Sequence, residues 1–200
     1  MSAVWTGEEV IMVGAGVSYG FAYRTATDTW RMIGVPMSRH SPFMVWTGRE
    51  VIVWGGYTFD PDYDPVYPNT GSRYDPALDR WTDMPVSGSP ALGGSGTTLW
   101  DGEGMILRTH DGHFYRYVPA SGWSRISTVN EPGGFTQTMV WTGEHVIVWG
   151  WYGARDRGAR YDPRSDSWTP LSQPMQGGSR HSHTAAWTGN LMILWGDEAP

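Results

Sequence analysis

The sequence has no cysteine, few charged residues and no long apolar run, and each absence excludes a class of protein. Without cysteine there is no disulfide, no thiolate metal site and no cysteine nucleophile. Charged residues make up 17% of the chain, the net charge is −6, and the basic residues are scattered. Nucleic-acid binding normally needs a basic patch, so we expect no nucleic-acid partner. The apolar runs are strand-sized, whereas a membrane helix needs about 20 apolar residues, so we expect no membrane span, and no signal peptide is visible.

Aromatic residues and glycine are abundant instead. The chain of 200 residues contains 13 tryptophans, 10 tyrosines and 27 glycines. Aromatic side chains favour strands, and glycine favours the tight turns between them. The composition therefore predicts an all-β protein.

A repeat organises the whole chain. The segment 45–55, with Trp-Thr-Gly followed by the apolar run Val-Ile-Val-Trp, recurs almost unchanged at 140–150. Looser copies begin at Val4 and Ala186, and a degenerate copy begins at Leu99. A second signature, a tyrosine followed after a short turn by tryptophan, comes after each of the first four copies. The tryptophans that mark the five copies lie 41 to 54 residues apart and are Trp5, Trp46, Trp100, Trp141 and Trp187.

Each complete unit predicts four antiparallel strands. Thr-Gly makes a tight turn between the first two, and Asp-Pro-x-x-Asp makes the turn between the last two. One such sheet cannot bury both of its faces, so the units must stack on each other around an axis. We predict a single β-propeller segment of four complete blades and half of a fifth, an open arc or part of a larger ring. The expected blades span about 1–36, 37–85, 86–128, 129–172 and, for the partial one, 173–200.

These features resemble the kelch repeat, and most closely its divergent bacterial and galactose-oxidase-like forms. The resemblance rests on Arg-His-Ser at 39–41 and 180–182, on glycines that end the second strand, on Tyr-Asp-Pro and on the spaced tryptophan. The paired glycine of that repeat survives only at 55–56. The resemblance implies a ring of roughly six or seven blades, slightly favours an extracytoplasmic location, and brings in binding and carbohydrate chemistry as expected functions.

The loop between the second and third strands of the second unit is the longest candidate site. Its four aromatic residues, Tyr57, Phe59, Tyr63 and Tyr67, are expected to form a recognition surface, because exposed tyrosine is a frequent interface anchor. Three alternating aspartates at 60, 62 and 64 are spaced as calcium ligands could be, but the glycine and glutamate of an EF-hand are missing. A solvated, proline-stiffened loop is the preferred interpretation, and we assign no metal and no cofactor.

Histidine and charged residues on the same face are further candidates for ligand binding. His40 and His181 occupy equivalent positions of the repeat, which favours a hydrogen-bonding role near the central channel. His181 and His183 share one face of a strand and, with His40, could offer imidazoles to a metal, but the sequence positions no carboxylate beside them. Arg155 could bind an anion, and Glu131 could act as a general acid or base. The remaining candidate binding residues are Arg39, Tyr152 and Arg180.

Three functions remain open. The favoured one is a binding scaffold that recognises a protein or a glycan through the loop face. The second is a carbohydrate-active enzyme of the epimerase type, in which Arg39, Arg180 and Glu131 would converge on the channel. The third is a purely structural module. The absence of cysteine excludes the copper-radical chemistry of galactose oxidase, and no residue is assigned as catalytic.

Overall fold

The computed structural model describes residues 1–91, 96–133, 135–152, 155–172 and 183–196, and every regular element within these ranges is a β-strand. Four antiparallel four-stranded sheets follow one another along the chain, and we call them blades 1 to 4. Two further strands form half of a fifth blade. The described residues contain no helix, and therefore no helix that is long and apolar enough to cross a membrane.

The strand bounds follow the repeat. Blade 1 contains β1 (Ser2–Trp5), β2 (Glu9–Val13), β3 (Tyr19–Arg24) and β4 (Thr29–Gly34). Blade 2 contains β5 (Phe43–Trp46), β6 (Val51–Trp54), β9 (Gly71–Asp75) and β10 (Arg80–Asp83), with a separate hairpin, β7 (Thr58–Phe59) and β8 (Pro65–Val66), inserted between β6 and β9. Blade 3 contains β11 (Thr97–Trp100), β12 (Met105–Arg108), β13 (Phe114–Val118) and β14 (Gly122–Arg125). Blade 4 contains β15 (Phe135–Trp141), β16 (Val146–Tyr152), β17 (Arg155–Asp162) and β18 (Ser167–Pro170), and the half-blade contains β19 (Thr184–Trp187) and β20 (Met192–Trp195).

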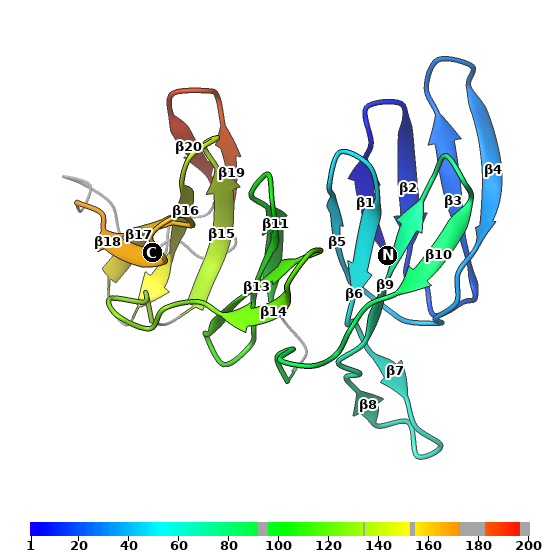
Figure 1. The fold of residues 1–200 in the computed structure, drawn as a ribbon, viewed down its shortest axis with the longest axis horizontal. Coiled ribbons are helices and arrows are strands. Elements are labelled where there is room, and N and C mark those ends of the chain that lie inside the picture. The colour runs from blue at the N-terminus through cyan, green and yellow to red at the C-terminus, as the bar shows by residue number, and fades with distance from the viewer. Residues whose placement is uncertain (92–95, 134, 153–154, 173–182, 197–200) are drawn as a thin grey trace.

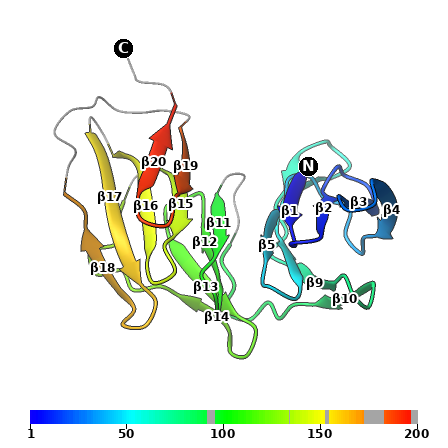
Figure 2. The ribbon, with the colours of Figure 1, turned by 90° about the horizontal axis from the view of Figure 1, so that it is seen from above.

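The sheets are arranged as propeller blades. The first strand of each sheet lies beside the first strand of the next, from β1 through β5, β11 and β15 to β19. In Figure 2 these strands lie on the inner side of the arc, and β4, β14 and β18 lie on its outer side. The predicted all-β, propeller-like fold of four blades and a half is therefore confirmed.

The Trp-Thr-Gly signature forms the same turn in successive blades. The hydroxyl oxygens of Thr6, Thr47 and Thr142 each accept a hydrogen bond at 2.9 Å from the backbone N–H three residues further on. The glycine inside the turn has a φ between 92° and 97° in these copies, a conformation that strains residues with a Cβ. In the degenerate copy Asp101 replaces the threonine, and its Oδ1 accepts the N–H of Gly104 at 2.7 Å.

The second signature forms a turn closed by a tyrosine. The hydroxyl of Tyr74 donates to Oδ1 of Asp79 at 2.5 Å, and Tyr161 donates to Asp166 at 2.9 Å. Both aspartates have a positive φ, 47° and 48°. Burial, followed by the hydrogen bond to Asp79, raises the pKa of Tyr74 to about 12. The tyrosine ring also packs against the tryptophan of the neighbouring strand, with 4.8 Å between the ring centroids in blade 2.

The core lies between blades, because alternate residues of each second strand point to opposite faces of the sheet. Ile11 and Val13 of blade 1 pack with Val51 and Val53 of blade 2. The same strand of blade 2 turns Ile52 and Trp54 toward Met105, Leu107 and Trp123 of blade 3, and blade 3 turns Ile106 toward Val146 and Val148 of blade 4. Each blade thus has a leading face, toward the next blade, and a trailing face, toward the preceding one.

Candidate functional site

The β7–β8 hairpin projects away from the sheets. It leaves blade 2 at the end opposite the Thr-Gly turns, and it points downward in Figure 1. Two of its aromatic side chains are exposed to solvent, Phe59 by 47% and Tyr63 by 84%. Tyr57 and Tyr67 lie at the base and are partly buried, with 6.1 Å between their ring centroids. These four residues are the aromatic candidates that the sequence predicted, and the structure brings them together on one hairpin.

The tip of the hairpin is held by Asp60. Its Oδ1 accepts hydrogen bonds from the backbone N–H groups of Asp62 and Asp64, both at 2.9 Å. The backbone of Asp60 also bonds with that of Asp64 at 3.0 Å and accepts the N–H of Tyr63 at 3.1 Å. Tyr63 has a φ of 65°, which this turn imposes. The first of the three alternating aspartates therefore shapes the tip, while Asp62 and Asp64 remain exposed.

The base of the insertion is closed by Arg39. Its guanidinium donates to the carbonyl oxygens of Gly55 and Thr70, at 3.1 and 2.7 Å, and also to the hydroxyl of Thr70. These two residues are the first and last of the long connection between β6 and β9. Burial lowers the pKa of Arg39. The side chain therefore clamps the loop from which the hairpin projects, through both terminal nitrogens of its guanidinium.

His40 joins the hairpin to blade 1. Its backbone exchanges two hydrogen bonds with Tyr57, at 2.8 and 3.0 Å, and forms a bridge with Ala15. Its imidazole stacks on Tyr57, with 5.1 Å between centroids, and contacts Phe59 edge-on at 5.6 Å. Any Cβ at position 16 would come within 2.3 Å of its Nε2, so Gly16 makes room for the ring. The imidazole of His40 therefore contacts the aromatic surface directly, and its expected hydrogen-bonding role near the central channel stays a prediction.

Glu131 lies in a separate place, on the connection between blades 3 and 4. Its Oε1 accepts the backbone N–H of Phe114 at 3.1 Å, and its Oε2 lies 3.4 Å from Nδ1 of His113 and 3.5 Å from a guanidinium nitrogen of Arg125. These last two residues were not predicted from the sequence, because nothing in the repeat pairs them with the inter-blade connection.

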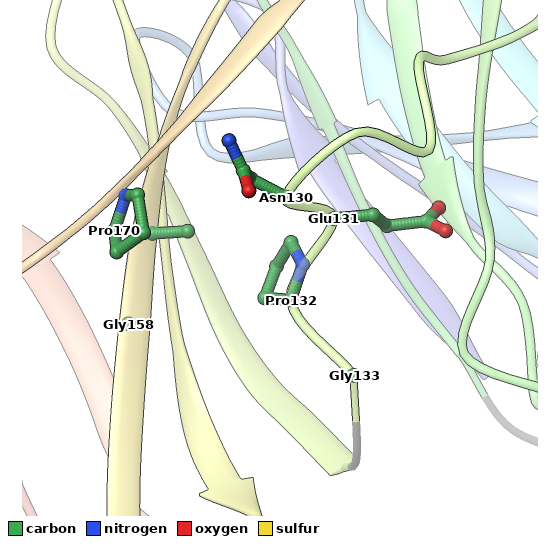
Figure 3. A pocket seen from close by; sticks show the side chains of 7 residues that line it. Asn130, Glu131, Pro132, Gly133, Gly158 and Pro170 are labelled. Atoms are coloured by element: carbon green, nitrogen blue, oxygen red, sulfur yellow. The ribbon is translucent and has the colours of Figure 1, made fainter.

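A cavity of about 380 Å³ lies beside Glu131, lined also by Asn130, Pro132, Gly158 and Pro170. Figure 3 shows the carboxylate of Glu131 pointing away from Gly158 and Pro170. The carboxylate is therefore directed toward blade 3 and its hydrogen-bond partners rather than across the cavity. Glu131 and Arg39 belong to two different sets of contacts, one on blade 3 and one on blade 2.

The other candidate residues differ in how the structure places them. In the expected loop at 152–157, residues 152 and 155–157 are strand residues, because β16 and β17 continue their ladder to the pair of Tyr152 and Arg155. His183 is buried, and its Nε2 lies 3.1 Å from the hydroxyl of Thr138, which connects the half-blade to blade 4. Arg180 and His181 lie outside the described residues.

Together, the radial four-stranded sheets and a projecting aromatic hairpin define a propeller-like protein with one elaborated loop. No protein-family model and no curated protein sequence matches the chain. The fold is similar to that of the solved structure of YjhT, with a TM-score of 0.72 and 12% sequence identity. That similarity covers 96% of this chain and 70% of the YjhT chain, and at such low identity it shows the fold alone.

Proposed function

We propose that the chain is a kelch-type propeller that acts as a binding scaffold and recognises a protein through the tip of the β7–β8 hairpin. The observation that carries this proposal is the exposure of Phe59 and Tyr63, 47% and 84%, on a hairpin whose turn and base are both fixed by hydrogen bonds. A rigid tip loses little conformational entropy on binding, so its aromatic surface contributes more of its contact energy to affinity. Tyrosine is also among the side chains that dominate interface energetics.

The shape of the hairpin favours a protein over a small ligand. Small-molecule sites are concave and enclose most of the ligand, whereas this hairpin protrudes from the sheets. A protruding aromatic tip suits insertion into a groove on a partner. A glycan remains the alternative ligand, and the test below includes it.

The charge of the tip further restricts the kind of surface that a partner can offer. Asp62 and Asp64 flank Tyr63 and are exposed. Complementary potentials favour association, so the proposed partner surface is an apolar groove with a basic rim. Binding to such a surface is expected to weaken as ionic strength rises.

The proposal is tested with a displayed random peptide library and a printed glycan panel, both probed with the intact chain. We expect peptides that combine apolar and basic residues to be enriched. The Phe59→Ala/Tyr63→Ala variant should bind the selected peptides at least about tenfold more weakly, since loss of two interface aromatics costs more than about 1.4 kcal/mol. Leu78→Ala, an exposed apolar residue at the other end of blade 2, is the matched control and should bind as wild type.

Two results would refute the protein-binding proposal. One is selection of glycans rather than peptides, and the other is a double variant that binds the selected peptides as tightly as wild type. If neither probe binds, the structural-module function is favoured instead. The epimerase-type function has less support, because Arg39 and Glu131 are held in separate networks.

A further inference from the structure

Three aromatic rings contact each other where the hairpin leaves blade 2. His40 stacks on Tyr57 with 20° between the ring planes, and Phe59 forms T-shaped contacts with His40 and Tyr57, at 5.6 and 5.5 Å between centroids. Tyr57 and Phe59 belong to the insertion, whereas His40 belongs to the connection between blades 1 and 2. Phe59, which is 47% exposed, is therefore held in place by a ring from outside the hairpin.

The side chain of His40 makes these contacts as a ring and not through its nitrogens. Within the part of the chain that the structure describes, neither imidazole nitrogen forms a hydrogen bond or an ion pair. The polar contacts come from the backbone of His40, whose N–H donates to the carbonyl oxygen of Tyr57 at 2.8 Å and whose carbonyl oxygen accepts the N–H of Tyr57 at 3.0 Å. Aromatic pairs in stacked and T-shaped arrangements attract each other beyond the apolar area that they bury. The imidazole is thus placed to orient its two aromatic neighbours.

Blade 1 holds the imidazole from the other side. Gly16 lies on the connection between β2 and β3, and its N–H donates to the carbonyl oxygen of Arg39 at 3.0 Å. The preceding residue, Ala15, forms a bridge with His40. A Cβ at position 16 would clash with Nε2 and Cε1 of the imidazole, so the ring lies directly against the backbone of blade 1. The position of the imidazole is therefore set by blade 1.

We propose that His40 is a positioning residue of the recognition tip, and that blade 1 sets the orientation of Phe59 through it. This inference rests on the proposed function, because it names the residue that prepares the tip for its partner. A Phe59 ring that is already oriented loses little conformational freedom on binding. Without the imidazole, the partner would have to order the ring, which should weaken binding by about two- to tenfold, the cost of immobilising one side chain.

Two substitutions at position 40 separate stacking from hydrogen bonding. His40→Phe keeps a flat ring and removes both nitrogens, whereas His40→Gln keeps polar atoms and removes the ring. If His40 orients Phe59 by stacking, His40→Phe should behave as wild type, and His40→Gln should behave as His40→Ala. A hydrogen-bonding role near the central channel, which the equivalent positions in the repeat favour, predicts the reverse order.

The first readout needs no binding partner. 4-Fluorophenylalanine is incorporated biosynthetically into the intact chain, which has five phenylalanines, and fluorine NMR spectra are recorded. The Phe59 signal is the one that disappears in Phe59→Leu. In wild type and in His40→Phe this signal should be clearly shifted from that of free 4-fluorophenylalanine. In His40→Ala and His40→Gln it should move toward the free signal, because the ring loses its oriented environment.

Two glycines of blade 1 test the same coupling from the other side. Gly16 and Gly7 both have a positive φ, 72° and 97°, so alanine is strained at either position. At position 16 the new Cβ would meet the imidazole, whereas at position 7 no described atom lies within 4 Å of it. Gly16→Ala should therefore displace the Phe59 signal as His40→Ala does. Gly7→Ala is the matched control and should leave the signal unchanged.

The second readout is the affinity for the peptides selected by the intact chain. His40→Ala, His40→Gln and Gly16→Ala should bind them about two- to tenfold more weakly than wild type, and His40→Phe and Gly7→Ala should bind equally well. Failure to select any peptide would count against the proposed function, while the fluorine spectra would still decide whether His40 positions Phe59.

Three results would overturn the inference. One is a Phe59 signal that is the same in wild type and in His40→Ala. Another is a signal that His40→Gln preserves and His40→Phe does not. The third is a set of peptides whose binding depends on Phe59 but that bind His40→Ala as tightly as wild type.

Discussion

The two ends of the blades differ in how much they vary. At one end the turns repeat almost unchanged, with threonine or aspartate holding each first turn and a tyrosine closing each complete second turn in blades 1, 2 and 4. At the other end the connections differ in length and contacts, and one of them extends into the β7–β8 hairpin. The repeating end holds the ion pairs of Glu9 and Asp101, whereas the variable end carries the hairpin with its exposed Phe59 and Tyr63.

This difference separates stability from recognition. Residues at the repeating end are constrained by the same contacts in several blades, so they have little freedom to acquire a function. The hairpin contributes little to the inter-blade cores, and its aromatic tip is free to contact a partner. Substitutions at the repeating end should therefore change the free energy of unfolding, and substitutions at the tip should change binding.

The largest effect at the repeating end is expected for Asp101→Thr. This change restores the threonine that the other copies have, so repeat similarity alone predicts stabilisation. We expect the opposite, a loss of about 2–3 kcal/mol, because Oδ2 of Asp101 is buried and accepts from Nε of Arg116 at 2.7 Å. Urea unfolding measures the change. The control is Glu103→Gln, at an exposed side chain, which should change the free energy of unfolding by less than about 0.5 kcal/mol. An increase in stability would show that the turn matters and the ion pair does not.

Glu9→Gln is expected to cost about 1–3 kcal/mol at neutral pH. The Glu9 carboxylate accepts from Arg31 at 2.8 Å and from Arg24 at 3.0 Å, and the hydrogen bond from Arg31 is the main cause that lowers its pKa below the ordinary 4.5. A lowered folded-state pKa stabilises the fold above pH 4.5, and this contribution is lost as the pH falls through the folded-state value.

The difference in unfolding free energy between wild type and Glu9→Gln should therefore shrink on acidification below pH 4.5. Glu8→Gln, whose side chain is 76% exposed, should be nearly neutral. A difference that stays constant with pH would contradict the assigned pKa shift.

Gly48→Ala tests the repeated turn with a smaller expected effect. No atom would contact the new Cβ, but the φ of 92° strains any residue other than glycine, and we expect a loss of about 1 kcal/mol. Gly34→Ala also meets open space and has no positive φ, so it should be neutral or slightly stabilising. Thermal unfolding gives the midpoint temperature of each variant. Equal midpoint temperatures for Gly48→Ala and Gly34→Ala would argue against strain in the turn.

The smallest stability effect is expected at the variable end. Phe59→Ala/Tyr63→Ala should change the free energy of unfolding by less than about 0.5 kcal/mol, because both side chains are exposed. The same variant should lose binding. A large loss of stability, measured by urea unfolding, would show that the hairpin is part of the core and not a free recognition element.

The sequence was sufficient to predict the repeating parts of the molecule. Trp-Thr-Gly and Tyr-Asp-Pro encode local turns, so their contacts fall within a few residues of each other and can be inferred from spacing. The continuous apolar run at 51–54 predicted a strand covered on both faces, and all four residues are buried. The aromatic residues of the long loop were also recognised as candidates from the sequence.

The remaining contacts depend on positions far apart in the chain. Arg39 would contribute to a channel site in the epimerase-type alternative, but its partners are the two ends of a loop that the sequence could not place beside it. Glu131 likewise bonds to blade 3 through partners that no spacing indicates. The sequence predicted a loop where the structure has this hairpin, because two-residue strands such as β7 and β8 are too short to show a periodic pattern of hydrophobicity.

Amide hydrogen exchange followed by mass spectrometry tests the separation of core and tip most directly. The account predicts that residues 51–54 of β6 exchange only through global unfolding, whereas residues 58–66 of the hairpin exchange through local opening at a much lower free energy. If the hairpin were protected as strongly as β6, it would be an integral part of the folded core, and the division between a structural end and a recognition end would be wrong.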